Sequence, residues 1–122
     1  MNKAKIKWLA EPQKHDYAAA RAYLCLIVPP REAKRLVDKL KRADVGAFAA
    51  KDIFRASALP LLGSSDSYVR RDRALITHKE SLSPILLVRD PAKGKLIVAD
   101  GYHRLCAVYT FDEDAMINCR IV

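Results

Sequence analysis

The stretch VADGYHRLCAVY, residues 98–109, decides the fold because it joins two kinds of local structure. A short apolar run ends at Asp100-Gly101, and a helix-like segment follows with His103 and Arg104 in its first turn. The unpaired N–H groups at the start of a helix carry partial positive charge, so each cation there is unfavourable by about 0.3–1 kcal/mol. A negatively charged ligand at this turn would offset that cost.

The turn has the features of a phosphate site. A strand that leads through a glycine into a helix directs the first N–H groups of the helix toward one point. Gly101 lets the backbone approach a ligand closely, and His103 and Arg104 can donate further hydrogen bonds to phosphate oxygens. We therefore expect phosphate to be bound by Gly101, Tyr102, His103 and Arg104, with Asp100 and His103 as the candidate catalytic residues.

Three roles are open for Asp100: a helix cap, a magnesium ligand, or a base for a bound substrate. The alternative that needs no ligand makes Asp100 the cap, gives Arg104 a surface ion pair and gives His103 a hydrogen bond in the core. A turn covered by packed side chains, with Arg104 held by an internal carboxylate, would contradict the phosphate hypothesis.

The composition is that of a single domain with an ordinary core. The chain has 122 residues, of which 51% are hydrophobic and 30% are charged. Its cysteines, Cys25, Cys106 and Cys119, lie in apolar surroundings and form no CxxC pair, which favours reduced thiols over disulfides and gives no support to a metal site. No apolar leader begins the chain, and no apolar run reaches the roughly 18–20 residues of a membrane span. We therefore expect a cytoplasmic protein with no membrane partner.

A formal net charge of +8 suggests an anionic partner. Residues 31–42, REAKRLVDKLKR, carry six Lys or Arg and two acidic residues, and their apolar positions recur at helical spacing. This pattern predicts an amphipathic helix with a basic outer face. Lys34, Arg35, Lys39 and Arg42 are the candidates for contact with DNA or an acidic protein. The alternative is a solvated face that only aids solubility.

Sequence patterns predict an α+β fold with a small mixed sheet and packed helices. Helices are expected at residues 14–28, 31–42, 66–77 and 102–111, a hairpin at 85–88 and 96–99, a last strand at 117–122, and a short strand at 6–9. The segment 47–62 is ambiguous between helix and strand. Its core candidates are Ile53, Phe54, Leu59, Leu61 and Leu62.

The segment PILLVRDPAKGKLIVADGYHRLCAVYTFDEDAMINCRIV, residues 84–122, resembles the ParB/sulfiredoxin superfamily. In that family a Pro-Ile strand, a hairpin, a Gly-x-His-Arg or Gly-x-Arg-Arg turn, a helix and a closing strand form the nucleotide-binding core. The resemblance covers about residues 50–122. It implies a ParB/sulfiredoxin-like domain over residues 46–122, with residues 1–45 as an N-terminal helical extension packed on the core in one unit.

The sequence departs from the sulfiredoxin branch of this family at one position. In sulfiredoxins the turn is Gly-Cys-His-Arg, and its cysteine performs the ATP-dependent reduction of oxidised peroxiredoxin. Tyr102 stands at the position of that cysteine, so sulfiredoxin activity is not expected. Cys106 follows one helical turn later, and a buried structural role suits it better than that of a nucleophile.

The resemblance to ParB proteins implies a nucleotide ligand. Their Gly-Glu-Arg-Arg turn cradles CTP phosphates, and His103 and Arg104 align with its two arginines. The resemblance does not extend to the downstream nucleotide motif and the helix-turn-helix DNA reader of ParB, because the sequence ends at Val122. A ParB-like serine kinase with the same core uses a carboxylate base, a role open to Asp52 or Asp100.

Two hypotheses of function follow. In the first, the protein is a small enzyme that binds ATP, ADP or CTP with magnesium and transfers or hydrolyses a phosphoryl group. In the second, it is a non-catalytic module whose nucleotide site or basic helix regulates binding to DNA or to a protein partner. Nuclease activity is not expected, because no cluster of carboxylates has two-metal spacing.

Overall fold

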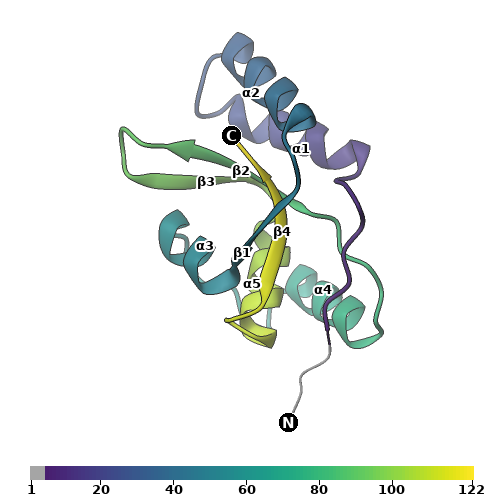
Figure 1. Ribbon diagram of the computed structural model, residues 1–122. Coiled ribbons are helices and arrows are strands. Elements are labelled where there is room, and N and C mark those ends of the chain that lie inside the picture. The colour runs from purple at the N-terminus through teal and green to yellow at the C-terminus, as the bar shows by residue number, and fades with distance from the viewer. Residues whose placement is uncertain (1–4) are drawn as a thin grey trace.

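A computed structural model describes residues 5–122 and shows an α+β fold in which helices cover both faces of one mixed sheet (Figure 1). In chain order, the elements are α1 (Lys14–Leu24), α2 (Pro30–Arg42), β1 (Gly46–Ala49), α3 (Ala50–Ser57), α4 (Ser67–Thr77), β2 (Ile85–Asp90), β3 (Lys95–Asp100), α5 (Tyr102–Phe111) and β4 (Met116–Ile121).

The four strands lie in the order β1-β4-β2-β3. β2 pairs antiparallel with β3 and parallel with β4, and β4 pairs antiparallel with β1. The chain leaves β3 at one edge, forms α5 against a face of the sheet, and returns as β4 on the far side of β2. The start of α5 therefore lies at the end of an edge strand, where a ligand can reach it.

Strand β2 explains why helices pack on both faces of the sheet, because side chains on both faces of this strand are buried. Ile85 and Leu87 point into a core formed with α3, α4 and α5. Leu86 and Val88 point into a second core formed with α1 and α2. This is the period-2 alternation of a strand applied to a continuous apolar run. The N-terminal helices thus cover one face of β2 and β3.

The first part of the chain differs from expectation in three places. The segment 6–9 forms only an isolated parallel bridge between Trp8 and Leu82 rather than a strand. Helix α1 ends at Leu24, and residues 25–28 form a turn that leaves Leu26 84% exposed. Cys25 in this turn is also exposed, so the expectation of apolar surroundings is wrong for this thiol. No disulfide links the three cysteines.

The other elements follow the predicted pattern closely. The basic helix, the hairpin, α4, α5 and the last strand are confirmed. Asp66 caps α4 by accepting hydrogen bonds from the N–H groups of Tyr68 and Val69 at 2.9 and 3.0 Å. The ambiguous segment after residue 45 divides into β1 and α3, and Leu61 in the following loop is exposed rather than in the core.

Within residues 5–122, no helix has the length and apolar character needed to cross a membrane.

Candidate functional site

The site is built around the junction of β3 and α5. β3 ends at Asp100, and Gly101 turns the chain with a φ of 109°, a left-handed conformation that glycine adopts without a side-chain clash. A Cβ at this position would lie 2.7 Å from the Cβ of Ile85, so the turn requires glycine for space as well as for conformation. The backbone at the start of α5 is therefore held tightly against β2.

The first N–H groups of α5 are available to a ligand. The earliest amide of the helix with a backbone acceptor is that of Leu105, which donates to the carbonyl of Gly101 at 2.9 Å. In the part of the chain that is described, neither a side chain nor a carbonyl accepts from the amides of Tyr102 and His103. Asp100 does not cap the helix, because its carboxylate is engaged elsewhere. An anion is the natural acceptor for donors of this kind.

Two hollows meet at this turn, and both include Asp100, Gly101, Tyr102 and His103 in their walls. The larger has a volume of about 440 Å³, and its other walls are Ala19 and Tyr23 of α1, Leu59, Val98 and Ala99. The smaller has a volume of about 100 Å³ and is completed by Tyr68, Arg71, Asp72 and Arg104. The turn is thus open on two sides, with a mostly apolar hollow on one side and a polar hollow on the other.

Arg104 is not free to serve a ligand in the way the sequence suggested. Its Nη2 donates to Oδ2 of Asp100 at 2.9 Å, and its Nη1 lies 3.6 Å from Oδ1 of Asp16 in α1. The Arg104 side chain is only 16% exposed, and its buried Nε atom has no hydrogen-bond partner. One of the two conditions that would contradict the phosphate hypothesis is therefore met, whereas the other is not, since the turn is open.

Asp16 is the more firmly held of the two carboxylates that face Arg104. Its side chain is 2% exposed and accepts hydrogen bonds from the Ser83 hydroxyl and, at 2.8 Å, from the Gln13 N–H. Burial alone would raise the pKa of Asp16. The hydrogen bonds from Ser83 and Gln13 and the charge of Arg104 outweigh burial, so this pKa lies below its ordinary value. Asp16 is therefore the charged partner of Arg104.

The pKa of Asp100 is shifted in the opposite direction from that of Asp16. Burial raises the pKa of Asp100 more than the Arg104 guanidinium lowers it, and the neighbouring Asp16 carboxylate raises it further. A carboxyl whose pKa is raised in this way accepts a proton more readily than an exposed one, which suits the role of a base that was open to it.

His103 lies half-buried between two tyrosine rings. Its ring centroid is 5.0 Å from that of Tyr68 in α4 and 5.7 Å from that of Tyr102. The Tyr102 hydroxyl donates to the carbonyl of Pro60, which fixes this ring over the loop that follows α3. His103 is thus positioned by aromatic contacts at the mouth of both hollows.

Asp72 was missed by the sequence analysis, although the pattern of α4 contains a signal for it. Val69, Asp72 and Ile76 are the buried positions of that helix, so a carboxylate occupies its apolar stripe. Asp72 is 5% exposed, lines the polar hollow, and forms no hydrogen bond or ion pair within the described residues. Burial raises its pKa, while the nearby charges of Arg104, Arg71 and His103 lower it. The same kind of signal marks Asp16, which shares the buried stripe of α1 with Ala20 and Leu24.

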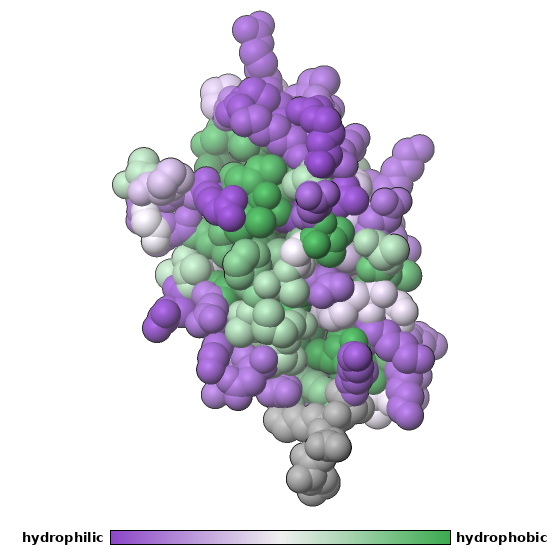
Figure 2. Space-filling model, in the orientation of Figure 1, coloured by the Kyte–Doolittle hydropathy of each residue, from purple (hydrophilic) through white to green (hydrophobic). Residues whose placement is uncertain are grey.

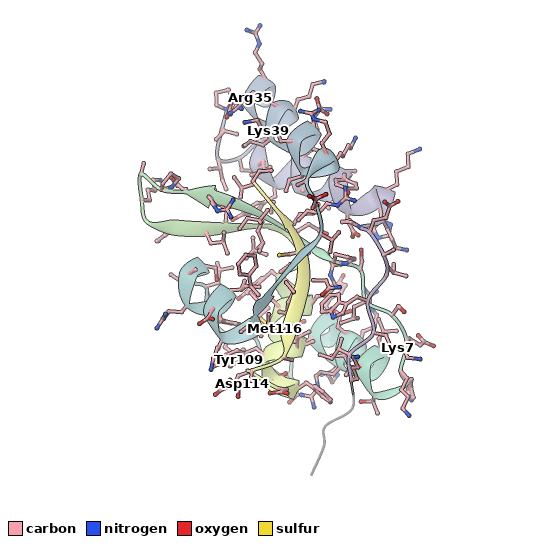
Figure 3. All side chains as sticks on the ribbon, viewed as in Figure 1. Lys7, Arg35, Lys39, Tyr109, Asp114 and Met116 are labelled. Atoms are coloured by element: carbon pink, nitrogen blue, oxygen red, sulfur yellow. The ribbon has the colours of Figure 1, made fainter. Side chains whose placement is uncertain are left out.

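The candidate nucleic-acid residues all lie on α2, where Arg35 and Lys39 project outward at one end of the molecule (Figure 3). Hydrophilic side chains gather over this helix, whereas hydrophobic residues form a band across the middle of the same face (Figure 2). Lys34 is paired with Asp38 at 2.8 Å, and Arg35 with Glu32, so acids of the same helix offset two of the four candidates.

The candidate site residues therefore lie in two places, the turn between β3 and α5 and the outer face of α2. Asp100, Gly101, Tyr102 and His103 meet at one turn, with Arg104 directed inward behind them. Across residues 5–122, no three His, Cys, Asp or Glu side chains are grouped so that they alone could hold a metal ion. Asp52 lies apart from the turn, in the wall of an apolar hollow between β1, α3 and the sheet.

Comparison with known proteins adds no relative: no family model, no curated protein and no solved structure matches this chain.

Proposed function

We propose that the protein binds a phosphate-bearing ligand, a nucleotide such as ATP, ADP or CTP, at the turn between β3 and α5. The observation that carries this proposal is that the N–H groups of Tyr102 and His103, at the start of a ten-residue helix, donate to no acceptor within the described residues. They lie beside a hollow of about 440 Å³. A hollow of that volume is in the range that small ligands occupy. Phosphate oxygens would accept from the amides, and the rest of the ligand would lie against α1 and β3.

The ParB/sulfiredoxin-like interpretation of residues 46–122 supports the same ligand. The resemblance includes the turn itself, whose counterpart in ParB proteins cradles CTP phosphates. With Arg104 held by Asp100 and Asp16, the amides and His103 are the direct phosphate donors in this proposal, and Arg104 is a positioning residue. Helix α1 belongs to the site as well, because it supplies Asp16 and one wall of the larger hollow.

The residues at the turn would also suit phosphoryl transfer or hydrolysis. A bound phosphoryl group would lie beside Asp100, whose raised pKa favours proton acceptance, and beside the His103 imidazole. The protein would then contribute positioning and charge stabilisation, which supply most of the catalysis in reactions of this class.

A panel of ATP, ADP and CTP with magnesium, followed by thermal unfolding, tests the proposal. A ligand at 100 times its dissociation constant stabilises the folded state by about 2.7 kcal/mol. His103→Gln should weaken binding several-fold, while His78→Gln, at an exposed histidine that lines neither hollow, serves as the matched control. Phosphate release in the same samples distinguishes an enzyme from a binding module. No stabilisation by any nucleotide contradicts the proposal.

A second candidate is binding of DNA or an acidic protein through α2. The observation that favours it is the last turn of the helix, where Lys39, Lys41 and Arg42 gather without an acidic residue. Lys41 also lies over the Tyr17 ring, 5.6 Å from its centroid. Binding of DNA phosphates by lysine and arginine side chains does not depend on the DNA sequence and weakens steeply as salt concentration rises.

A further inference from the structure

Strand β1 forms one edge of the sheet, and its outer side is uncovered. The N–H of Ala50, directly after β1, donates to the carbonyl of Ala115 beside β4 at 2.9 Å. Because backbone groups alternate in direction along a strand, the N–H and C=O groups of Ala47 and Ala49 point away from β4. Within residues 5–122, these outward groups form no hydrogen bond. β1 therefore presents an open row of donors and acceptors.

The sequence of β1 does not protect this edge. Natural edge strands usually carry charges, a proline or a bulge, because an open edge pairs readily with another chain. Gly46–Ala49 has none of these. Phe48 is 42% exposed on one face of the edge, and Met116 of β4 is 53% exposed on the other. The hydrophobic band in Figure 2 crosses the region where β1 and β4 lie in Figure 1, so the edge has the character of an interface.

The open edge is complementary to itself. A two-fold axis perpendicular to the sheet at Phe48 would place β1 of two copies side by side and antiparallel. Ala47 of each copy would then lie opposite Ala49 of the other, and their outward groups would form backbone hydrogen bonds. The two Phe48 side chains would meet at a non-hydrogen-bonded position, where cross-strand side chains approach most closely. Helix α3 leaves this edge open, because it packs against β3 as well as β1.

Charges at the two ends of β1 favour a second copy as the partner. The last turn of α2, shortly before β1, is basic and contains Lys39, Lys41 and Arg42. The turn at residues 112–114 is acidic and lies at the other end of β1, where the Glu113 carbonyl accepts from the N–H of Lys51 at 2.9 Å. Figure 3 shows Lys39 and Asp114 at opposite ends of this strand. Antiparallel pairing would bring the basic end of each copy beside the acidic end of the other.

We infer that two copies of this chain associate through β1, in an antiparallel pair that joins their sheets and brings opposite charges together at both ends. The inference is independent of the proposed function, because the turn after β3 lies at the opposite edge of the sheet. A four-residue strand forms a small interface, so the dimer dissociates on dilution.

Analytical ultracentrifugation of the full chain, from about 10 μM to about 1 mM, tests the inference in the range of weak association. Ala49→Pro removes an outward N–H that has no partner in the single chain, and the φ of Ala49, −64°, suits proline. By symmetry the dimer loses two hydrogen bonds, so its dissociation constant should rise at least about tenfold. Phe48→Lys should weaken it as well, by placing like charges opposite each other. Leu61→Lys, at an exposed leucine outside β1, is the matched control and should leave the dimer unchanged. A melting temperature for each variant establishes that it is folded.

Charge reversal tests the orientation of the pair. Arg42→Glu and Glu113→Lys should each weaken the dimer, whereas a chain with both changes should associate more tightly than either single variant. A chain that stays monomeric to about 1 mM, or a dimer that Ala49→Pro and Phe48→Lys leave intact, overturns the inference. A double variant that associates no more tightly than the single variants overturns the antiparallel arrangement. Stabilisation by nucleotides, measured separately, decides the proposed function whichever result is obtained.

Discussion

Helix α2 and the start of α5 both concentrate cations, and they use them in different ways. On α2 the cations are exposed, and those that are paired take acids from the same helix one turn away, as Lys34 does with Asp38. At the start of α5, Arg104 is mostly buried and takes acids from two other elements, Asp100 at the end of β3 and Asp16 in α1. Charge number alone would rank α2 as the functional region, whereas burial and partners favour the start of α5.

The difference follows from the solvent around each group. Exposed ion pairs are screened by water and salt and contribute only about 0–1 kcal/mol each. A buried guanidinium with two carboxylates is screened much less, so loss of one partner leaves an uncompensated charge. The four predictions below test this contrast, from the largest expected effect to the smallest.

Replacement of the Arg104 guanidinium should have the largest effect on stability. Arg104→Met keeps much of the side-chain volume but leaves Asp16 and Asp100 buried without their cation, and we expect a loss of about 3–5 kcal/mol in the free energy of unfolding at pH 7. Arg35→Met, the matched change on α2, should cost less than about 1 kcal/mol. Urea unfolding measures both. Similar losses in the two variants would show that the contrast between the regions is wrong.

Gly101→Ala tests the tightness of the turn. The new Cβ would adopt a left-handed conformation and meet Ile85, so we expect a loss of about 2–4 kcal/mol. Gly94→Ala, in the hairpin turn, is the control. Gly94 also has a positive φ, of 63°, but its Cβ would meet nothing within 4 Å, so only the backbone cost of about 1–2 kcal/mol applies. Equal melting temperatures for the two variants would contradict the close packing of the turn on β2.

Asp72→Asn should stabilise the protein in the absence of ligand. Burial raises the pKa of Asp72 from 3.8, so the folded state prefers the protonated carboxyl, and its ionisation at neutral pH destabilises the fold. Asparagine carries no such charge, and we expect the melting temperature at pH 7 to rise by roughly 2–5 °C, the shift that about 1 kcal/mol produces in a domain of this size.

The gain from Asp72→Asn depends on pH in a defined direction. It should be complete above the raised pKa of Asp72, shrink as pH falls through that pKa, and vanish below 3.8, where the unfolded carboxyl is protonated as well. Asp52→Asn, a change at an exposed aspartate outside the polar hollow, should not raise the melting temperature at pH 7. A lower melting temperature for Asp72→Asn at pH 7 would mean that the carboxylate has a protein partner.

The smallest effect on stability is expected from the exposed face of α2. Replacement of Lys34, Arg35, Lys39 and Arg42 by alanine removes two exposed ion pairs, so unfolding should change by less than about 1 kcal/mol. If this face binds DNA, the variant should lose affinity and show a flatter dependence on salt concentration. Unchanged DNA binding in a salt series would exclude these residues as the contact surface.

Local signals in the sequence predicted much of the fold and the centre of the site. The Asp-Gly break, the Pro-Gly hairpin turn and the alternation of the last strand each depend on neighbouring residues, so α5 begins at Tyr102 as predicted. The end of α1 was placed too late, because apolar residues 25–28 resemble a helix in sequence but form an exposed turn.

The partners of Arg104 could not be predicted, because they depend on how distant segments pack. The sequence offered Arg104 as a phosphate ligand, whereas the docking of α1 on the sheet places Asp16 beside it. Asp16 and Asp72 are each a carboxylate on an otherwise apolar helical stripe. This pattern was the available signal that both acids face inward.

Backbone amide NMR during titration with magnesium and ADP tests the central claim most directly. The account predicts that the amide resonances of Tyr102 and His103 move furthest, since these two N–H groups would bind the phosphate oxygens. It also predicts smaller changes at Ala19 and Tyr23, in the α1 wall of the larger hollow. Saturable shifts confined to α2, or no shifts at the start of α5 at millimolar ligand, would contradict it.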